Sequence, residues 1–314
     1  MISIITAHYN SSEKIDALIS SLKRQTSEEF EWIIVDDCSR TEEYITMRKK
    51  VECTELNAIV LRNKKNGGPG FARNNGLQKS TGDYITFIDC DDAVSKDFVE
   101  VLNRLSKEKR ADIIAFDYIR IRGKHKNKCN KIDHAENGEI EIHTFLLQAK
   151  TCVCGSIFKR SLIRENNITF PNLYRYEDWV FNVYASVCSS TIWYEKRELY
   201  YYIESEHSLV TSGKHDAAEY ASKAFILIED LMKNYNQEVL ELLYAREILY
   251  VNAISKAKRY SMKEYKYHMK ILTEKHPSWR KNSYIKKLPI HQRFILTALS
   301  YRLYSLVKLI SAVI

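Results

Sequence analysis

The sequence has few of the residues that mark linkers, fibrous chains and disulfide-linked modules. Its 314 residues include nine Gly, four Pro and seven Cys. So little Gly and Pro excludes a collagen-like or linker-dominated chain. An odd number of cysteines without a Cys-x-x-Cys pair argues against a disulfide-linked secreted module. Cys152 and Cys154 are one residue apart, and no His/Cys pair at zinc-finger spacing completes a site with them.

A secretion signal is also lacking at the start of the chain. The first residues, 1–5, have neither a basic segment nor a small-residue cleavage site. We therefore expect the protein in a reducing cytoplasm. A chain that is 45% hydrophobic and 28% charged has the composition of a folded protein with a sizeable core.

Acidic residues are missing from the last forty positions. No Asp or Glu follows Glu274, whereas eight basic residues do, namely Lys275, Arg280, Lys281, Lys286, Lys287, Arg293, Arg302 and Lys308. Residues 1–274 carry 40 Lys and Arg against 40 Asp and Glu, so the net charge of +8 belongs to the tail. This distribution argues against nucleic acid as a partner and favours a local anionic partner for the tail.

Residues 1–120 alternate β-branched runs with helical patterns, which predicts βαβ units and a mainly parallel sheet flanked by helices. We expect strands at 2–6, 32–35, 58–61, 84–88 and within 112–121, and helices over 15–22 and 71–79. Asn10 and Glu13 have the spacing of a capping box for the first helix. Residues 124–131, with four Lys, are interpreted as a solvated hairpin tip. Beyond 216 the pattern is helical, over 217–235, 238–260 and 262–275.

Polar clusters follow three of the expected strands, at 8–10, 36–37 and 89–92. Ligands of open α/β sheets bind at the carboxyl ends of parallel strands. Crowded carboxylates repel one another unless a cation neutralises them, and Mg²⁺ or Mn²⁺ suits such oxygen ligands. A solvated acidic turn would explain the same residues. The glycine loop 67–70 lacks the P-loop and GxGxxG patterns, and it is either a phosphate cradle or a steric turn.

Five motifs occur in an order that one family shares. They are TAHYN at 6–10, IVDDCS at 34–39, NGGPGFARNNG at 66–76, FIDCDD at 87–92 and YEDWVF at 176–181. A closing strand and loop at 200–211 follow them. In this order and spacing, the region 1–212 resembles the family 2 glycosyltransferases of GT-A fold, of the type that builds bacterial surface polysaccharides.

The resemblance implies roles for five residues around a nucleotide-sugar. Tyr9 would stack on the base and Asp37 would bond its edge. Arg73 would lie at the nucleotide side, and Asp89 would hold the ribose or the hydration shell of the metal. Asp91 would bind the divalent cation, Mn²⁺ or Mg²⁺, that bridges the diphosphate.

Two further roles concern the reaction itself. Asp178 would be the base that deprotonates the acceptor hydroxyl, and His207 would contact the diphosphate or the metal. An acidic first turn of a helix is the structural alternative for Glu177 and Asp178. The sequence departs from the family at Ala7, where Pro is usual, which changes loop stiffness and not chemistry.

The tail has an amphipathic pattern. At 100° per residue, Ile295, Leu299, Leu303, Leu306, Ile310 and Val313 fall on one face of a single expected helix, into which Arg302 intrudes. Basic residues inside this segment argue against a spanning helix and favour one that lies in the inner-leaflet interface. Packing on the protein or across a dimer is the alternative.

These observations predict a catalytic domain at 1–212, a helical region at 213–276 and a basic amphipathic tail at 277–314. The expected activity is metal-dependent inverting transfer of one hexosyl or N-acetylhexosaminyl group. The donor would be a nucleotide-sugar, with UDP favoured, and the acceptor a glycan or lipid-linked glycan. We expect a peripheral protein on the cytoplasmic face of the membrane, and a homo-oligomer is left open. A nucleotidyltransferase and a non-catalytic membrane-bound scaffold are the alternatives.

Overall fold

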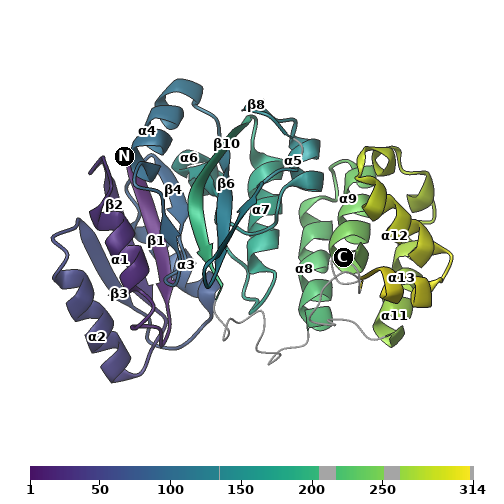
Figure 1. Ribbon diagram of the computed structural model, residues 1–314. Helices are drawn as coiled ribbons and strands as arrows, with labels where there is room; N and C mark the ends of the chain where they lie inside the picture. Colours follow the sequence, from purple (N-terminus) through teal and green to yellow (C-terminus); the bar gives the residue numbers. More distant parts are fainter. Residues whose placement is uncertain (134, 205–216, 251–261, 312–314) are drawn as a thin grey trace. The chain divides into compact units, whose positions relative to one another are not determined.

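The computed structural model of the chain describes residues 1–133, 135–204, 217–250 and 262–311 (Figure 1). The chain divides into two compact units. The first unit contains Met1–Phe145 and Ala149–Ser208, and the second contains Leu146–Gln148 and Leu209–Ile314. The boundaries predicted at 212 and 276 stay predictions.

A mixed sheet forms the centre of the first unit, in the order β3-β2-β1-β4-β9-β6-β10-β5. Its strands are β1 (Ile2–His8), β2 (Phe30–Asp36), β3 (Ala58–Arg62), β4 (Tyr84–Phe87), β5 (Ala93–Val94), β6 (Ile113–Arg122), β7 (His125–Cys129), β8 (Gly138–Glu139), β9 (Ser156–Lys159) and β10 (Ile192–Ile203). The β3-β2-β1-β4 half is entirely parallel, and β9 is antiparallel to both of its neighbours. The predicted α/β fold is confirmed.

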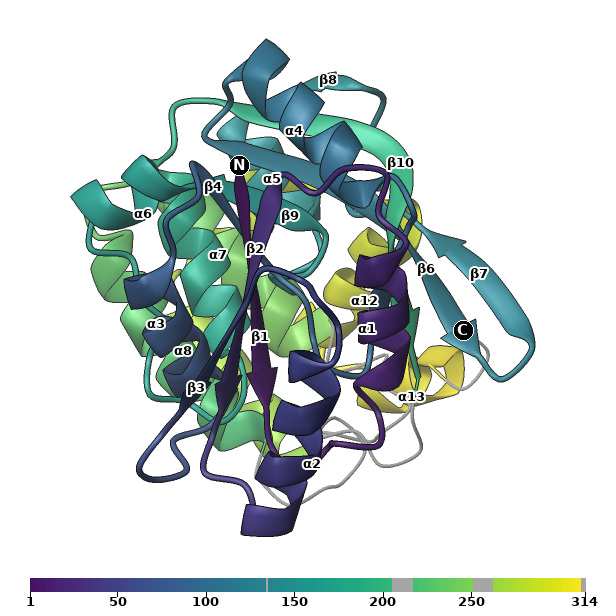
Figure 2. The same ribbon diagram turned by 90° about the vertical axis from the view of Figure 1, so that its left-hand side faces the viewer.

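Helices cover both faces of this sheet because of the strand order. From β1 the chain moves outward to β2 and β3 through α1 (Asp16–Lys23) and α2 (Thr41–Glu52), and it then returns to β4 through α3 (Pro69–Lys79). Right-handed crossovers in opposite directions put α3 on the face opposite α1, as Figure 2 shows. The other helices of this unit are α4 (Phe98–Lys109), α5 (Ile142–Gln148), α6 (Arg160–Glu165) and α7 (Glu177–Cys188).

Four phenylalanines join α7 to the centre of the sheet. The ring of Phe181 on α7 stacks on Phe170 at 4.1 Å between centroids, and it meets Phe87 of β4 and Phe158 of β9 edge-on at 5.4 and 5.3 Å. All four side chains are buried. Edge-to-face pairs add to the free energy of burial. This cluster therefore fixes the first turn of α7 beside the end of β4.

The predicted cap of the first helix is wrong. Helix α1 begins at Asp16, and no side chain caps it. Asn10 instead has a left-handed backbone, and its side-chain oxygen accepts the N–H of Arg40 at 2.9 Å, just before α2. A partner distant in sequence has replaced the local capping bond.

The lysine-rich segment is also more ordered than predicted. Residues His125–Cys129 form strand β7, antiparallel to β6. Its side chains are mostly exposed, in agreement with a solvated hairpin, but Lys131, two residues after the strand, is completely buried.

The second unit is helical over its described residues. It contains α8 (Ala217–Leu231), α9 (Gln237–Leu243), the π-helix η1 (Tyr244–Tyr250), α11 (Met262–Lys275), the short η2 (Trp279–Lys281) and η3 (Ser283–Lys287), α12 (Ile290–Ser300) and α13 (Tyr304–Ser311). Within the described ranges, no helix is both long and apolar enough to cross a bilayer.

The tail forms two helices and not the single helix that we predicted. Arg302 has a left-handed backbone; its N–H bonds to Leu299 O, and the N–H of Leu303 bonds to Ala298 O. This pair of bonds is a Schellman motif, which ends α12. Ile295 and Leu299 are buried within the protein, whereas Leu303 is half exposed, so the predicted apolar face is divided. Val313 lies outside the described residues.

Candidate active site

Parallel strands β1, β2 and β4 bring three polar segments to one edge of the sheet. Tyr9 follows β1, Asp37 follows β2, and Asp89 lies two residues after β4. Tyr9 is 49% exposed, and so its ring is accessible to a ligand. The expectation that these segments share one edge is confirmed by the parallel register of the three strands.

Arg73 of α3 joins three acidic residues from distant parts of the chain. Its Nη2 donates to Asp89 Oδ1 at 2.9 Å, and its Nη1 donates to Glu177 Oε1 at 3.1 Å and Asp178 Oδ1 at 2.7 Å. The guanidinium is almost fully buried and lies over the ring of Phe170, 5.4 Å from its centroid. The structure thus brings together three of the predicted site residues, Arg73, Asp89 and Asp178.

Burial and mutual repulsion set the charge of this cluster. Burial, followed by the charge of Asp178, raises the pKa of Glu177 to about 8 despite the nearby Arg73. Burial also raises the pKa of Asp178, with Arg73 opposing and Asp89 adding to the shift. Burial would lower the pKa of Arg73, but its three carboxylate partners hold it well above the usual value. At neutral pH the cluster therefore contains the cation of Arg73 beside a largely protonated Glu177.

Asp178 has the geometry that a general base needs. Its Oδ1 accepts from Arg73, and its Oδ2 accepts the N–H of Val153 at 3.3 Å. The side chain keeps about a quarter of its surface exposed, so a hydroxyl can reach it. A carboxylate with a raised pKa takes a proton more readily than an ordinary one.

The acidic residues after β4 have different surroundings. Asp92 is buried; its carboxylate accepts bonds from the hydroxyl of Tyr200 and the N–H of Ile203, which ties this loop to β10. Asp91 is partly exposed, with Lys14 Nζ at 3.8 Å. Burial and the charge of Asp89 raise the pKa of Asp91, against the effect of Lys14. An added cation near Asp91 would relieve this unfavourable burial of negative charge.

A metal fits this arrangement only together with other ligands. The described residues contain no group of three His, Cys, Asp or Glu side chains able to hold an ion. Mg²⁺ is commonly bound by one or two carboxylates plus substrate phosphates. Asp91, with Asp89 beside it, fits that kind of site.

Asp37 organises the glycine loop in the structure. Its two oxygens accept the N–H groups of Gly67 and Gly68, the latter at 2.7 Å, and the side-chain amide of Asn63 at 2.7 Å. Gly68 has φ +86°, a backbone that favours glycine. Two N–H groups that could have bound a phosphate are thus already used. The role of Asp37 at a base edge stays a prediction.

For two residues, His207 and Glu177, the sequence analysis and the described structure do not coincide. His207 lies outside the described residues. Glu177 was assigned no role, although it adjoins Asp178 in the sequence; its burial and its bond to Arg73, 104 positions earlier, were not visible there.

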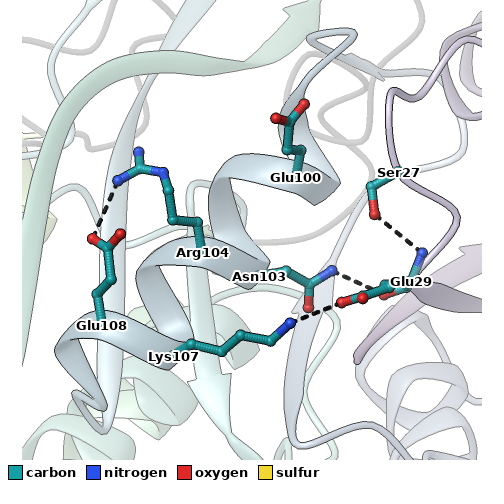
Figure 3. A pocket seen from close by; sticks show the side chains of 7 residues that line it. All are labelled: Ser27, Glu29, Glu100, Asn103, Arg104, Lys107 and Glu108. Atoms are coloured by element: carbon teal, nitrogen blue, oxygen red, sulfur yellow. Dashed lines mark hydrogen bonds and ion pairs between the residues drawn. The ribbon is translucent and has the colours of Figure 1, made fainter.

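A separate hollow lies away from this cluster. Its volume is about 410 Å³, and it lies between α4 and the segment before β2, at the opposite ends of the strands (Figure 3). Its charged side chains are largely paired with one another, Lys107 with Glu29 at 3.1 Å and Arg104 with Glu108 at 3.2 Å. It contains none of the predicted site residues, and we interpret it as a solvated surface groove.

Comparison with known proteins agrees with the motifs. Residues 3–166 match the family described as Glycosyl transferase family 2. A poly(ribitol-phosphate) beta-glucosyltransferase of Bacillus spizizenii is 31% identical over 67% of this chain. The chain spans about a third of that relative's length.

Solved structures agree on the fold. Staphylococcus aureus TarS residues 1–349, in complex with UDP-GlcNAc, aligns over 98% of this chain and 90% of that one, with a TM-score of 0.71 at 22% identity. A Pyrobaculum calidifontis mannosyltransferase, in complex with GDP-Man and Mn²⁺, aligns over 98% and 86%, with a TM-score of 0.52 at 15% identity. The chain belongs to glycosyltransferase family 2, and the prediction of that family and of a GT-A fold is confirmed.

Proposed function

We propose that this family 2 glycosyltransferase moves one glucosyl or N-acetylglucosaminyl group from a UDP-sugar to a hydroxyl of a poly(ribitol-phosphate)-like or lipid-linked glycan. The observation that supports it most strongly is that Arg73 hydrogen bonds to Asp89, Glu177 and Asp178. Through Arg73, the residue proposed to contact the nucleotide, Asp89, is joined to the proposed general base, Asp178. The relatives named above, which act on poly(ribitol-phosphate) or bind UDP-GlcNAc, support the choice of substrates.

Asp178 acts as the base in this proposal. An acceptor hydroxyl is a poor nucleophile at neutral pH, so a carboxylate must take its proton as the new bond forms. Arg73 and the Val153 N–H hold the two oxygens of Asp178 in a fixed orientation. In-line attack at the anomeric carbon with a single base inverts its configuration.

The leaving nucleoside diphosphate gains negative charge, which the site must accommodate. Tyr9 would stack on the base of the nucleotide, and Asp37 would bond the edge of that base. Asp91, with Asp89, would hold Mn²⁺ or Mg²⁺, which when bound stabilises the charge on the diphosphate. His207 would contact the diphosphate or the metal.

Transfer assays on the purified chain test this function. We expect consumption of UDP-GlcNAc or UDP-glucose with poly(ribitol-phosphate) as acceptor. The Asp178→Asn variant should lose about 10²- to 10⁴-fold in rate while it still binds UDP. Asp91→Asn should lose metal-dependent binding of the donor. Asp16→Asn, at an exposed ion pair with Lys50, is the matched control.

Other outcomes would favour the alternatives. If no UDP-sugar binds with or without metal, the scaffold interpretation leads. If a sugar phosphate and a nucleoside triphosphate react instead, the chain is a nucleotidyltransferase.

We further propose that the tail binds the anionic inner face of the membrane, which would make this a peripheral protein. Ile290, Phe294, Leu303 and Leu309 are each at least half exposed, in a segment without acidic residues. Such a surface combines apolar contact with attraction to anionic lipid.

Sedimentation of the protein with vesicles that contain phosphatidylglycerol tests this proposal. The bound fraction should fall for Phe294→Ser and in high salt. It should not change for Ile45→Ser, a matched exposed isoleucine on α2. Equal binding to neutral vesicles would contradict the electrostatic part of this proposal.

A further inference from the structure

Lys131 is a buried cation that the proposed function does not use. Its side chain is completely buried, two residues after the end of β7. Lysine is almost never buried without partners. Its Nζ donates to the carbonyl oxygens of Cys152 and Cys154, the latter at 3.2 Å, and approaches Cys152 Sγ at 3.8 Å. One ammonium thus holds both carbonyls of a single turn.

The residue between those carbonyls contacts the proposed base. The N–H of Val153 donates to Asp178 Oδ2 at 3.3 Å. The neighbouring Cys154 Sγ approaches Asp89 Oδ2 at 3.7 Å. The turn 152–154 therefore connects Lys131 to Asp178 and Asp89, two of the three acidic residues that Arg73 binds.

Lys131 is itself anchored to the sheet. Its backbone N–H donates to Asp117 Oδ1 of β6 at 2.7 Å, and the hydroxyl of Tyr194 of β10 donates to the same oxygen at 2.6 Å. The N–H of Lys150 donates to Lys131 O at 2.9 Å. The backbone of Lys131 is thus fixed to the sheet by hydrogen bonds. The position of its ammonium, and of the turn 152–154 that the ammonium binds, therefore depends on the sheet.

We propose that Lys131 is a positioning residue for the transfer reaction: its ammonium fixes the turn 152–154 so that the Val153 N–H orients the carboxylate of Asp178. This role rests on the proposed function. Val153 is the donor, and Lys131 acts through it without touching substrate.

The charge of Lys131 acts in the same direction as its hydrogen bonds. Asp178 is faced by Arg73 of α3, Glu177 of its own helix, Asp89 after β4, Cys154 of the turn and Lys131 after β7. Burial raises the pKa of Asp178; Arg73, the Val153 N–H and Lys131 lower it, and Asp89 raises it. Loss of Lys131 should therefore raise this pKa and leave less base ionised at acidic pH.

The test is a pH–rate profile of UDP-GlcNAc transfer to poly(ribitol-phosphate) by the full chain. Lys131→Met should lower kcat by about 10- to 100-fold, as expected for a misplaced catalytic group. It should also move the acid limb to higher pH while KM for the donor stays within about threefold. Lys150→Met removes the side chain of the partly exposed lysine whose backbone N–H bonds to Lys131 O, and it should change neither kcat nor the acid limb.

A milder variant separates orientation from charge. Lys131→Gln keeps a donor for the carbonyls but no charge, so kcat should recover in part while the acid limb stays shifted. This variant also decides the matter if Lys131→Met does not fold. A wild-type chain that consumes no donor overturns the proposed function and this role with it. An active wild type whose Lys131 variants keep its acid limb and kcat overturns only the role of Lys131.

Discussion

At the scale of single residues, Arg73 is the position on which the site depends most. It is the one cation that hydrogen bonds to Asp89, Glu177 and Asp178 among the described residues. Removing one partner of a buried ion pair leaves charge without compensation. The resemblance placed Arg73 at the nucleotide side, but its contacts with α7 span about a hundred positions of sequence and appear only once the sheet is assembled.

We predict that Arg73→Met lowers the free energy of unfolding by about 3–5 kcal/mol at pH 8. The loss should be smaller at pH 5, because burial has raised the pKa of Glu177 to about 8 and protonation then removes its charge. Urea unfolding at both pH values measures this. Arg48→Met, at an exposed pair on α2, should cost much less than Arg73→Met at both pH values. Equal losses at both pH values for Arg73→Met would contradict the electrostatic explanation.

Glu177 makes a separate prediction about pH. Because burial raises its pKa to about 8, folding takes up a proton at this residue. Its contribution to stability is complete below the ordinary value of about 4.3 and is lost as the pH rises through about 8. The Glu177→Gln variant should therefore gain stability relative to wild type between pH 5 and pH 8.5. Urea midpoints at several pH values give the difference, and a constant difference would show that Glu177 is ionised throughout.

At the scale of elements, the sequence predicted strands better than it predicted their connections. The runs that became β1, β2 and β4 are rich in β-branched or aromatic residues and are mostly buried, so periodicity and composition agree. Asn10 was misassigned because its partner, the N–H of Arg40, is thirty positions away. The tail was misassigned because its left-handed residue is Arg302, whereas glycine or asparagine is the usual sequence signal for such a helix end.

Glu31 of β2 joins the amino-terminal ends of three strands. Its Oε1 accepts from Ser3 of β1 and from Thr81 and Gly82, which precede β4. Burial alone would raise the pKa of Glu31, but these hydrogen bonds outweigh it, and the pKa is lowered. The stabilisation is present above the ordinary value of about 4.3 and is lost as the pH falls through the lowered pKa.

We therefore predict that Glu31→Gln lowers the free energy of unfolding by about 1–3 kcal/mol at pH 7. The difference from wild type should shrink below pH 4. Glu29→Gln, two residues earlier at an exposed pair with Lys107, should cost less than about 1 kcal/mol. Chemical unfolding at pH 7 and pH 3.5 measures both variants. A difference that persists at pH 3.5 would mean that packing, and not the charge-assisted bonds, is what the substitution removes.

At the scale of the whole molecule, the described candidate site lies within one unit. Tyr9, Asp37, Arg73, Asp91 and Asp178 all belong to the first unit, as does Asp89. The large hydrophobic core around the sheet is formed by residues between Ile2 and Tyr200. The residues proposed to bind the donor and their supporting core therefore lie in one part of the chain.

A chain that ends at residue 212 should therefore fold and bind UDP with a Kd within about threefold of that of the full chain. This corresponds to a difference of less than about 1 kcal/mol in binding free energy. Calorimetry with UDP and Mn²⁺ measures this. The fragment should be less soluble, because Leu146 and Leu147 are buried and group with the second unit, whose removal exposes them. Leu147→Ser should improve the solubility of the fragment and destabilise the full chain. A folded fragment that binds no UDP, beside a full chain that does, would place part of the donor site in the second unit.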